Sequence, residues 1–88
     1  MATRKVRGGV IETTQPNQEI IDDNNPITIM LLEDVTLENM LTDDIHCRIN
    51  YGDEILLMGK EKIKIDGLQI DSIIIKEVGS KVRYMGIE

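Results

Sequence analysis

The sequence predicts an all-β fold, a small antiparallel β barrel or sandwich of five to six strands with an extended N-terminal arm and at most one short helix. Residues 45–51 alternate between apolar and polar side chains, as a half-buried strand does. The apolar set contains fifteen isoleucines and only two aromatic residues, and β-branched side chains favour sheets. Four glycine-containing pairs separate short apolar runs, which predicts a meander in the second half: Gly52-Asp53, Gly59-Lys60, Asp66-Gly67 and Gly79-Ser80.

The chain has 88 residues, enough for one small domain. A domain of this size buries only about 60% of its unfolded surface, so its core is marginal. An intrachain disulfide is excluded because Cys47 is the only cysteine. We therefore expect self-association or docking onto a larger partner to supplement the core.

Residues 1–25 read as an extended or flexible arm, and residues 26–88 as the compact β domain. The arm is polar and rich in turn formers at residues 13–18 and again at residues 22–26. Its apolar pairs, Val10-Ile11 and Ile20-Ile21, are too few to offset its ordering entropy. Two outcomes remain open: the arm is disordered, or it is ordered on a neighbouring subunit with the isoleucine pair as an anchor.

The first part of the β domain contains one clear and one ambiguous segment. Residues 27–33 resemble a strand that is buried on both faces at its end. Residues 34–42 fit either a short helix or a loop with a single helical turn. In the helix, one face would carry Val35, Leu37, Met40 and Leu41.

The remaining strands follow from alternation and turn signals. In residues 45–51 the core face is predicted to carry Ile45, Cys47, Ile49 and Tyr51. Residues 54–58 form the next apolar run, and in residues 62–65 lysine alternates with isoleucine.

Asp66-Gly67 is the sharpest turn signal, because apolar pairs flank it on both sides. It predicts a two-residue type I′ hairpin from residues 62–65 into a strand at residues 68–76. Within that strand Ile73-Ile74-Ile75 is apolar on both faces, as expected of a central strand or an interface. The last strand is predicted over residues 81–87.

Charge is segregated along the chain. Residues 1–9 carry +3, residues 10–54 carry −10 and residues 55–88 carry +1, which gives the net charge of −6. Three cations give only weak, salt-sensitive attraction to nucleic acid, and few aromatic rings are present for base stacking. We therefore expect no direct contact with nucleic acid. No run approaches the ~20 apolar residues of a membrane span, so we also expect no membrane partner and a reducing cytoplasm as the site of synthesis.

No catalytic, cofactor or metal site is predicted, and we expect neither a cofactor nor a small-molecule substrate. A nucleophilic Cys47 would need a positioned base, but His46, its neighbour in a strand, points to the opposite face. The same geometry prevents the two from sharing a zinc ion. Carboxylate pairs such as Asp43-Asp44 lack the alternating spacing of a calcium loop, so they read as solvated turns.

Three features together resemble small structural proteins of tailed bacteriophages, such as capsid decoration or head-fibre base proteins. They are the basic start at residues 3–9, the polar arm and the isoleucine-rich ending at residues 73–87. The resemblance concerns architecture rather than a motif. It implies a non-enzymatic virion structural or assembly protein, made in the host cytoplasm, that docks on a capsid or tail lattice and associates with itself.

The residues expected to bind such a partner lie in the arm and in the isoleucine triplet: Arg4, Lys5, Arg7, Val10, Ile11, Ile20, Ile21, Ile73, Ile74 and Ile75. The alternative is a small acidic inhibitor or adaptor of a cellular enzyme. Its carboxylates would imitate the phosphates of a nucleic acid and steer it toward a basic groove.

Overall fold

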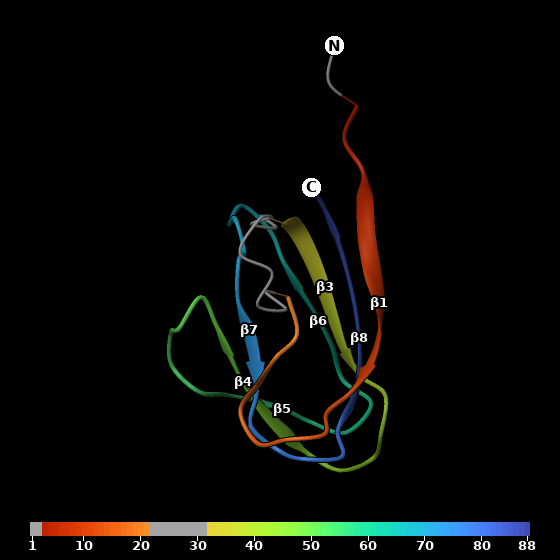
Figure 1. Ribbon diagram of the computed structural model, residues 1–88, viewed down its shortest axis with the longest axis vertical. Coiled ribbons are helices and arrows are strands. Elements are labelled where there is room, and N and C mark those ends of the chain that lie inside the picture. The colour runs from red at the N-terminus through yellow and green to blue at the C-terminus, as the bar shows by residue number, and fades with distance from the viewer. Residues whose placement is uncertain (1–2, 22–31) are drawn as a thin grey trace.

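The computed structural model describes residues 3–21 and 32–88, and these form two four-stranded antiparallel sheets without a helix (Figure 1). Sheet A has the order β1-β8-β3-β6, and sheet B has the order β2-β7-β4-β5. The strands are β1 (Val6–Glu12), β2 (Gln18–Glu19), β3 (Glu33–Asn39), β4 (Ile45–Ile49), β5 (Ile55–Leu57), β6 (Lys62–Ile65), β7 (Ile73–Ile75) and β8 (Lys81–Ile87). The predicted all-β class is confirmed, but the described residues form eight strands rather than the five to six expected, because the segments at residues 6–12, 18–19 and 33–39 also join the sheets.

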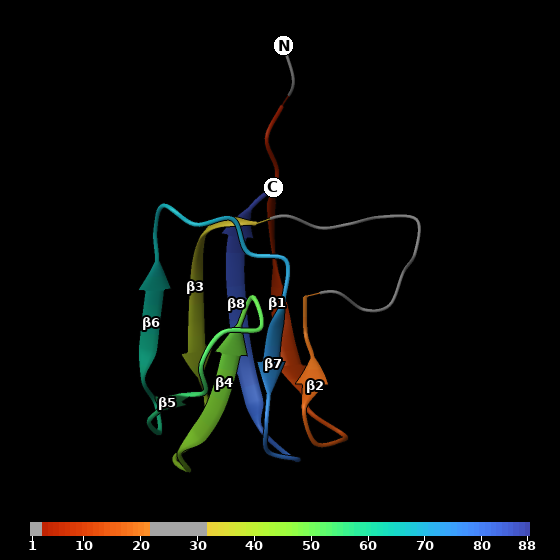
Figure 2. The same cartoon turned by 90° about the vertical axis from the view of Figure 1, so that its left-hand side faces the viewer.

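The core lies between the two sheets, which face each other in Figure 2. Sheet A contributes side chains such as Val35 and Leu37, and sheet B contributes Cys47, Ile73 and Ile75; all are at most 1% exposed. Side chains alternate across a strand, so each sheet supplies every second residue to this layer. The isoleucine triplet is therefore a central strand, with β7 lying between β2 and β4.

Residues 33–39 form strand β3, so neither the short helix nor the helical turn predicted within residues 34–42 is present. The alternation of Val35, Leu37 and Asn39 decides this, because all three are fully buried at a spacing of two. A one-residue bulge separates the Glu33 and Thr36 pairings with β8, and within it Asp34 has a positive φ of 52°. Aspartate tolerates this left-handed conformation better than most residues do.

The predicted meander is wrong, because among the strands of the described residues only β4 and β5 are consecutive in sequence and pair with each other. The turns Gly59-Lys60 and Asp66-Gly67, and the connection through Gly79-Ser80, each lead from one sheet to the other. Gly67 has the positive φ of 73° that its turn requires, yet β6 and β7 do not pair, so no type I′ hairpin forms. A turn signal specifies a change of direction, whereas the partner strand is selected by burial.

The N-terminal segment is part of the two sheets rather than a separate arm over its described residues. All seven residues of β1 pair with β8, and the following Thr13 is buried. Ile20 and Ile21, expected to anchor on a neighbour, are 5% and 2% exposed within the core of this chain. The physical reason is tertiary: β8 and β7 supply the ladder hydrogen bonds and apolar contacts that the segment lacks alone. Residues 22–31, which include the predicted break and most of the strand predicted at 27–33, lie outside the described residues.

Candidate docking surface

Strand β1 forms one edge of sheet A, and residues 3–5, which precede it, extend beyond the sandwich in Figure 1. Its side chains are exposed except for the half-buried Ile11, which packs against the core. Val6 and Val10 are 69% and 51% exposed. By strand alternation these two valines share the outer face of the sheet with Gly8, whereas Ile11 faces inward.

The peptide groups of β1 also alternate in the direction of their hydrogen bonds. The carbonyl of Lys5 accepts a hydrogen bond from the amide of Glu88, and the amide of Thr13 donates to the carbonyl of Ser80. Odd-numbered residues of β1 therefore direct their peptide groups toward β8. The even-numbered residues direct theirs to the other edge, where the described part of the chain supplies no strand.

The outer face of sheet A combines apolar side chains with side chains of both charges. Met85 is 46% exposed and pairs with Gly8 on one side and Thr36 on the other. A shallow depression of about 180 Å³ lies beside it and is lined by Thr36, Glu38, Lys62, Arg83, Tyr84 and Met85. A second, of about 300 Å³, lies on the other side and is lined by Val6, Asp34, Thr36, Lys64, Met85, Gly86 and Ile87. This face therefore offers apolar area beside charges of both signs, with lysine and arginine next to the carboxylates of Asp34 and Glu38.

Exposed ion pairs fasten the basic residues near β1. Arg4 lies 3.2 Å from Glu33 of β3, and the Nε of Arg7 donates to Glu88 at 2.7 Å. Both pairs are about half exposed, so each contributes at most about 1 kcal/mol. They connect the N-terminal segment to β3 and to Glu88, which follows β8.

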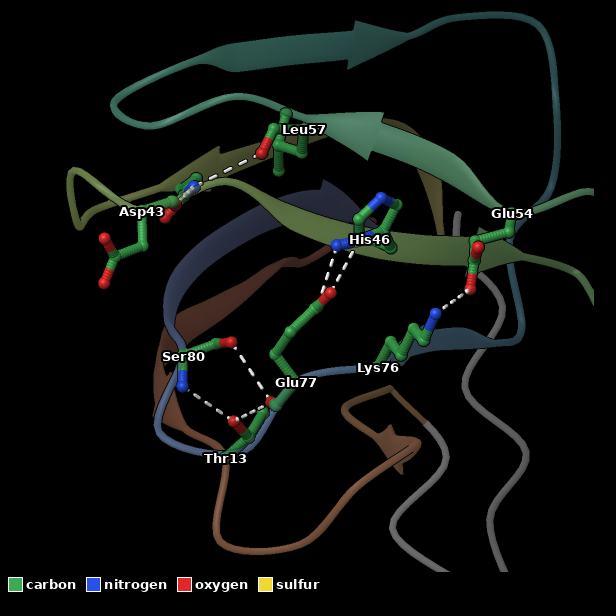
Figure 3. A network of polar contacts seen from close by, with 9 residues as sticks. Thr13, Asp43, His46, Glu54, Leu57, Lys76, Glu77 and Ser80 are labelled. Carbon is green, nitrogen blue, oxygen red and sulfur yellow. Dashed lines mark hydrogen bonds and ion pairs between the residues drawn. The ribbon is translucent and has the colours of Figure 1, made fainter.

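A polar network holds the opposite end of β1 (Figure 3). Thr13 Oγ1 donates to the carbonyl of Glu77 at 2.7 Å and accepts from the amide of Ser80 at 2.9 Å. The carboxylate of Glu77 in turn accepts from the amide of His46 at 2.8 Å and lies 2.6 Å from its ring Nδ1. This network connects the C-terminal end of β1 to the β7–β8 connection and, through Glu77, to β4. It therefore holds this end of the edge strand against both sheets.

The same network sets the ionisation of Glu77. Partial burial by itself raises the pKa of this carboxyl, but the hydrogen bonds from the His46 amide and ring outweigh it and hold the pKa below its usual value. Glu77 is thus kept charged within the network at neutral pH.

Cys47 is not a reactive thiol in this environment. It is 1% exposed, and desolvation by burial, followed by the charge of Glu77, raises its pKa to about 11. A thiol that stays protonated is a poor nucleophile and a poor metal ligand. His46 and Cys47 lie on opposite sides of β4, as alternation predicts: His46 reaches Glu77, whereas Cys47 points into the core.

The predicted partner-binding residues divide into two groups. Arg4, Lys5, Arg7 and Val10 lie together and exposed on or beside β1. Ile20, Ile21, Ile73 and Ile75 are core residues, while Ile11 and Ile74 are half-buried. The buried isoleucines are occupied within this chain and are not available to a partner.

Sequence reasoning missed the rest of the outer face, namely Val6, Lys62, Lys64, Arg83 and Met85. Alternation in residues 81–87 places Arg83 and Met85 on the face opposite Val82, which was a usable signal. No local signal places Val6 beside them, because that depends on the pairing of β1 with β8.

Within residues 3–21 and 32–88 no group of three or more His, Cys, Asp or Glu side chains is arranged to hold a metal ion. The same ranges contain no helix long and apolar enough to cross a membrane. Comparison with known protein families, curated proteins and solved structures finds no match to this chain.

Proposed function

We propose that this chain is a non-enzymatic virion structural or assembly protein, which docks on a capsid or tail lattice through the outer face of sheet A and the N-terminal segment. The observation that carries the proposal is the exposed β1 strand, whose valines continue the apolar and charged outer face of β8, β3 and β6. Apolar area flanked by charges of both signs suits a protein surface with a complementary charge pattern.

The first test asks whether the chain is present in particles. Particles would be purified in a density gradient from the source that encodes the chain, and the protein measured by quantitative mass spectrometry across the gradient. A constant ratio of this chain to the major shell protein across the particle band is the expected result. Its presence only among soluble proteins would overturn the proposal.

A second test locates the docking surface on the chain. Met85→Glu and Arg83→Glu introduce negative charge on the outer face of sheet A, and we expect each to lower co-sedimentation with particles lacking the native protein by about tenfold or more. Leu56→Glu is the matched control, because Leu56 is 51% exposed on β5 of the other sheet. Equal losses of co-sedimentation for all three variants, or no loss for any of them, would mean that the docking surface is not the outer face of sheet A.

Several acidic side chains argue against the inhibitor or adaptor alternative, because they accept backbone hydrogen bonds within this chain: Glu19, Asp44, Glu61 and Glu77. A carboxylate that accepts a hydrogen bond from the backbone of its own chain is positioned by the fold. It is not part of a surface array that has the spacing of nucleic-acid phosphates. The soluble fraction of the same gradient can be treated with a crosslinker. Crosslinking of the protein to a single cellular enzyme there would favour the alternative.

A further inference from the structure

We propose that the free edge of β1 pairs antiparallel with β1 of a second copy, in a register centred on Gly8. The two copies of sheet A then form one continuous eight-stranded sheet. This self-pairing is independent of lattice docking, so either proposal can hold without the other.

One edge of β1 is unpaired within the part of the chain that the structure describes, and the other edge pairs with β8. The strand is seven residues long and contains no proline. A long, exposed edge without such protection is a template for another strand.

The backbone direction restricts the possible registers. Since even-numbered residues of β1 direct their peptide groups to the free edge, an antiparallel partner must set even residues opposite even residues. Of these registers, the one centred on Gly8 sets Gly8 opposite Gly8 of the second copy. It also places each Val6 opposite the other copy's Val10.

The side chains favour that register. Val6 and Val10 are 69% and 51% exposed in the single chain. In this register Val6 of each copy packs against Val10 of the other, so the same contact is made twice across the two-fold axis. Two residues further out, each Arg4 lies opposite the other copy's Glu12, which makes two opposite-charge pairs. Shifting one strand by two residues sets Val6 opposite Glu12 or Arg4 opposite Val10, and so loses both matches.

The glycines at the centre help the two backbones to approach. Gly8 and Gly9 carry no side chain, so the middle of the new pairing presents a flat edge. A two-fold arrangement of this kind is closed, which gives a dimer rather than a fibre.

The decisive experiment is amide hydrogen exchange by NMR at several protein concentrations. The amides of Val6, Gly8, Val10 and Glu12 are expected to become protected as the dimer forms. The amides of Arg7, Gly9 and Ile11 serve as internal controls, because they are already engaged with β8 and stay protected throughout. A dimer in which the even-numbered amides still exchange rapidly, or a protein that remains monomeric at all concentrations, would overturn the proposal.

Variants then test the edge and the register by sedimentation velocity. Val10→Pro removes an edge amide without removing a bond to β8, and is expected to weaken dimerisation by about 100-fold or more. The control Val10→Thr keeps the amide and a β-branched side chain, so it should weaken dimerisation far less. An unchanged dimer in Val10→Pro refutes edge pairing.

A charge exchange tests the register even if the proline variant unfolds. Glu12→Arg and Arg4→Glu are each expected to weaken the dimer by about tenfold, since two symmetric pairs become repulsive. The double variant Arg4→Glu with Glu12→Arg should recover most of that loss. Absence of recovery contradicts the register centred on Gly8.

Discussion

At the scale of single residues, one buried amide joins the two sheets at one end. Asn39 of β3 is fully buried, and its Nδ2 donates to the carbonyls of Asp43 at 2.7 Å, Met58 at 3.1 Å and Leu57 at 3.3 Å. Its Oδ1 accepts from the amide of Leu41 at 3.2 Å. This asparagine therefore ends β3 and fixes the segments that lead into β4 and out of β5.

Replacement of this amide should be costly. Asn39→Ala leaves buried carbonyls without a donor, and is expected to lower the free energy of unfolding by about 2–3 kcal/mol. Urea denaturation followed by circular dichroism measures the loss. Gln69→Ala is the control, because Gln69 is exposed and, among the described residues, its side-chain amide makes one hydrogen bond, to the exposed carboxylate of Glu33. A loss at Asn39 no greater than at Gln69 would contradict the role assigned to Asn39.

The carboxyl of Glu77 gives a pH dependence whose sign follows from its lowered pKa. A carboxyl with a folded pKa below the ordinary value of 4.5 stabilises the fold when ionised. That stabilisation is present above pH 4.5 and is lost as the pH falls through the folded pKa. Glu77→Gln should therefore be less stable than the parent near pH 6, and the difference should shrink toward pH 3. Thermal unfolding across this range tests it, and a difference that grows on acidification would refute the assignment.

At the scale of elements, the N-terminal strands have different roles. β1 exposes nearly all its side chains, whereas the short β2 leads directly into the buried Ile20 and Ile21. Glu19 of β2 also accepts a hydrogen bond from the hydroxyl of the buried Ser72 and another from the amide of Ile73. Removal of residues 1–25 would therefore take away part of the core, so point substitutions are the appropriate test of the segment.

Ile21→Ala measures the contribution of this segment to the core. Loss of a fully buried isoleucine side chain to alanine is expected to cost about 2–5 kcal/mol of unfolding free energy. Val6→Ala is the control, since Val6 is 69% exposed and should change stability by less than about 0.5 kcal/mol. Similar effects for the two variants would mean that residues 20–21 do not pack as described.

At the scale of the whole molecule, the chain passes between the two sheets at most of its connections. Five of the six strand pairings join segments distant in sequence, and only β4 and β5 are local partners. Loop closure must precede such contacts, which slows folding.

Folding kinetics test this topology. Stopped-flow refolding is expected to take milliseconds to seconds, as for other domains dominated by non-local strand pairing. Ile45→Val, in the local β4–β5 pair, and Val82→Ala, in the central β8, are compared for their effects on the folding and unfolding rates. Folding on the microsecond scale would be inconsistent with these pairings.

The amino-acid sequence by itself determined the all-β class, the approximate positions of the strands in the second half, and the inward alternation of Ile45 and Cys47. These depend on the two-residue period of a strand, which is a local property. It also marked Arg4, Lys5, Arg7 and Val10 as partner-binding residues, and the structure places their side chains at the surface. The placement of Tyr51 on the same core face as Ile45 and Cys47 was wrong, because β4 ends at Ile49 and Tyr51, in the turn that follows, is 68% exposed.

Only the tertiary structure decided which strands pair. The turn at Asp66-Gly67 reverses the chain in either topology, but β6 pairs with β3 in sheet A and β7 pairs with β2 and β4 in sheet B, so their isoleucines enter the shared core from opposite sheets. Likewise, residues 6–21 cannot form a core alone, and β7 and β8, more than 50 residues away, supply it. The outer face of sheet A exists because those distant strands meet, and a local pattern does not encode that meeting.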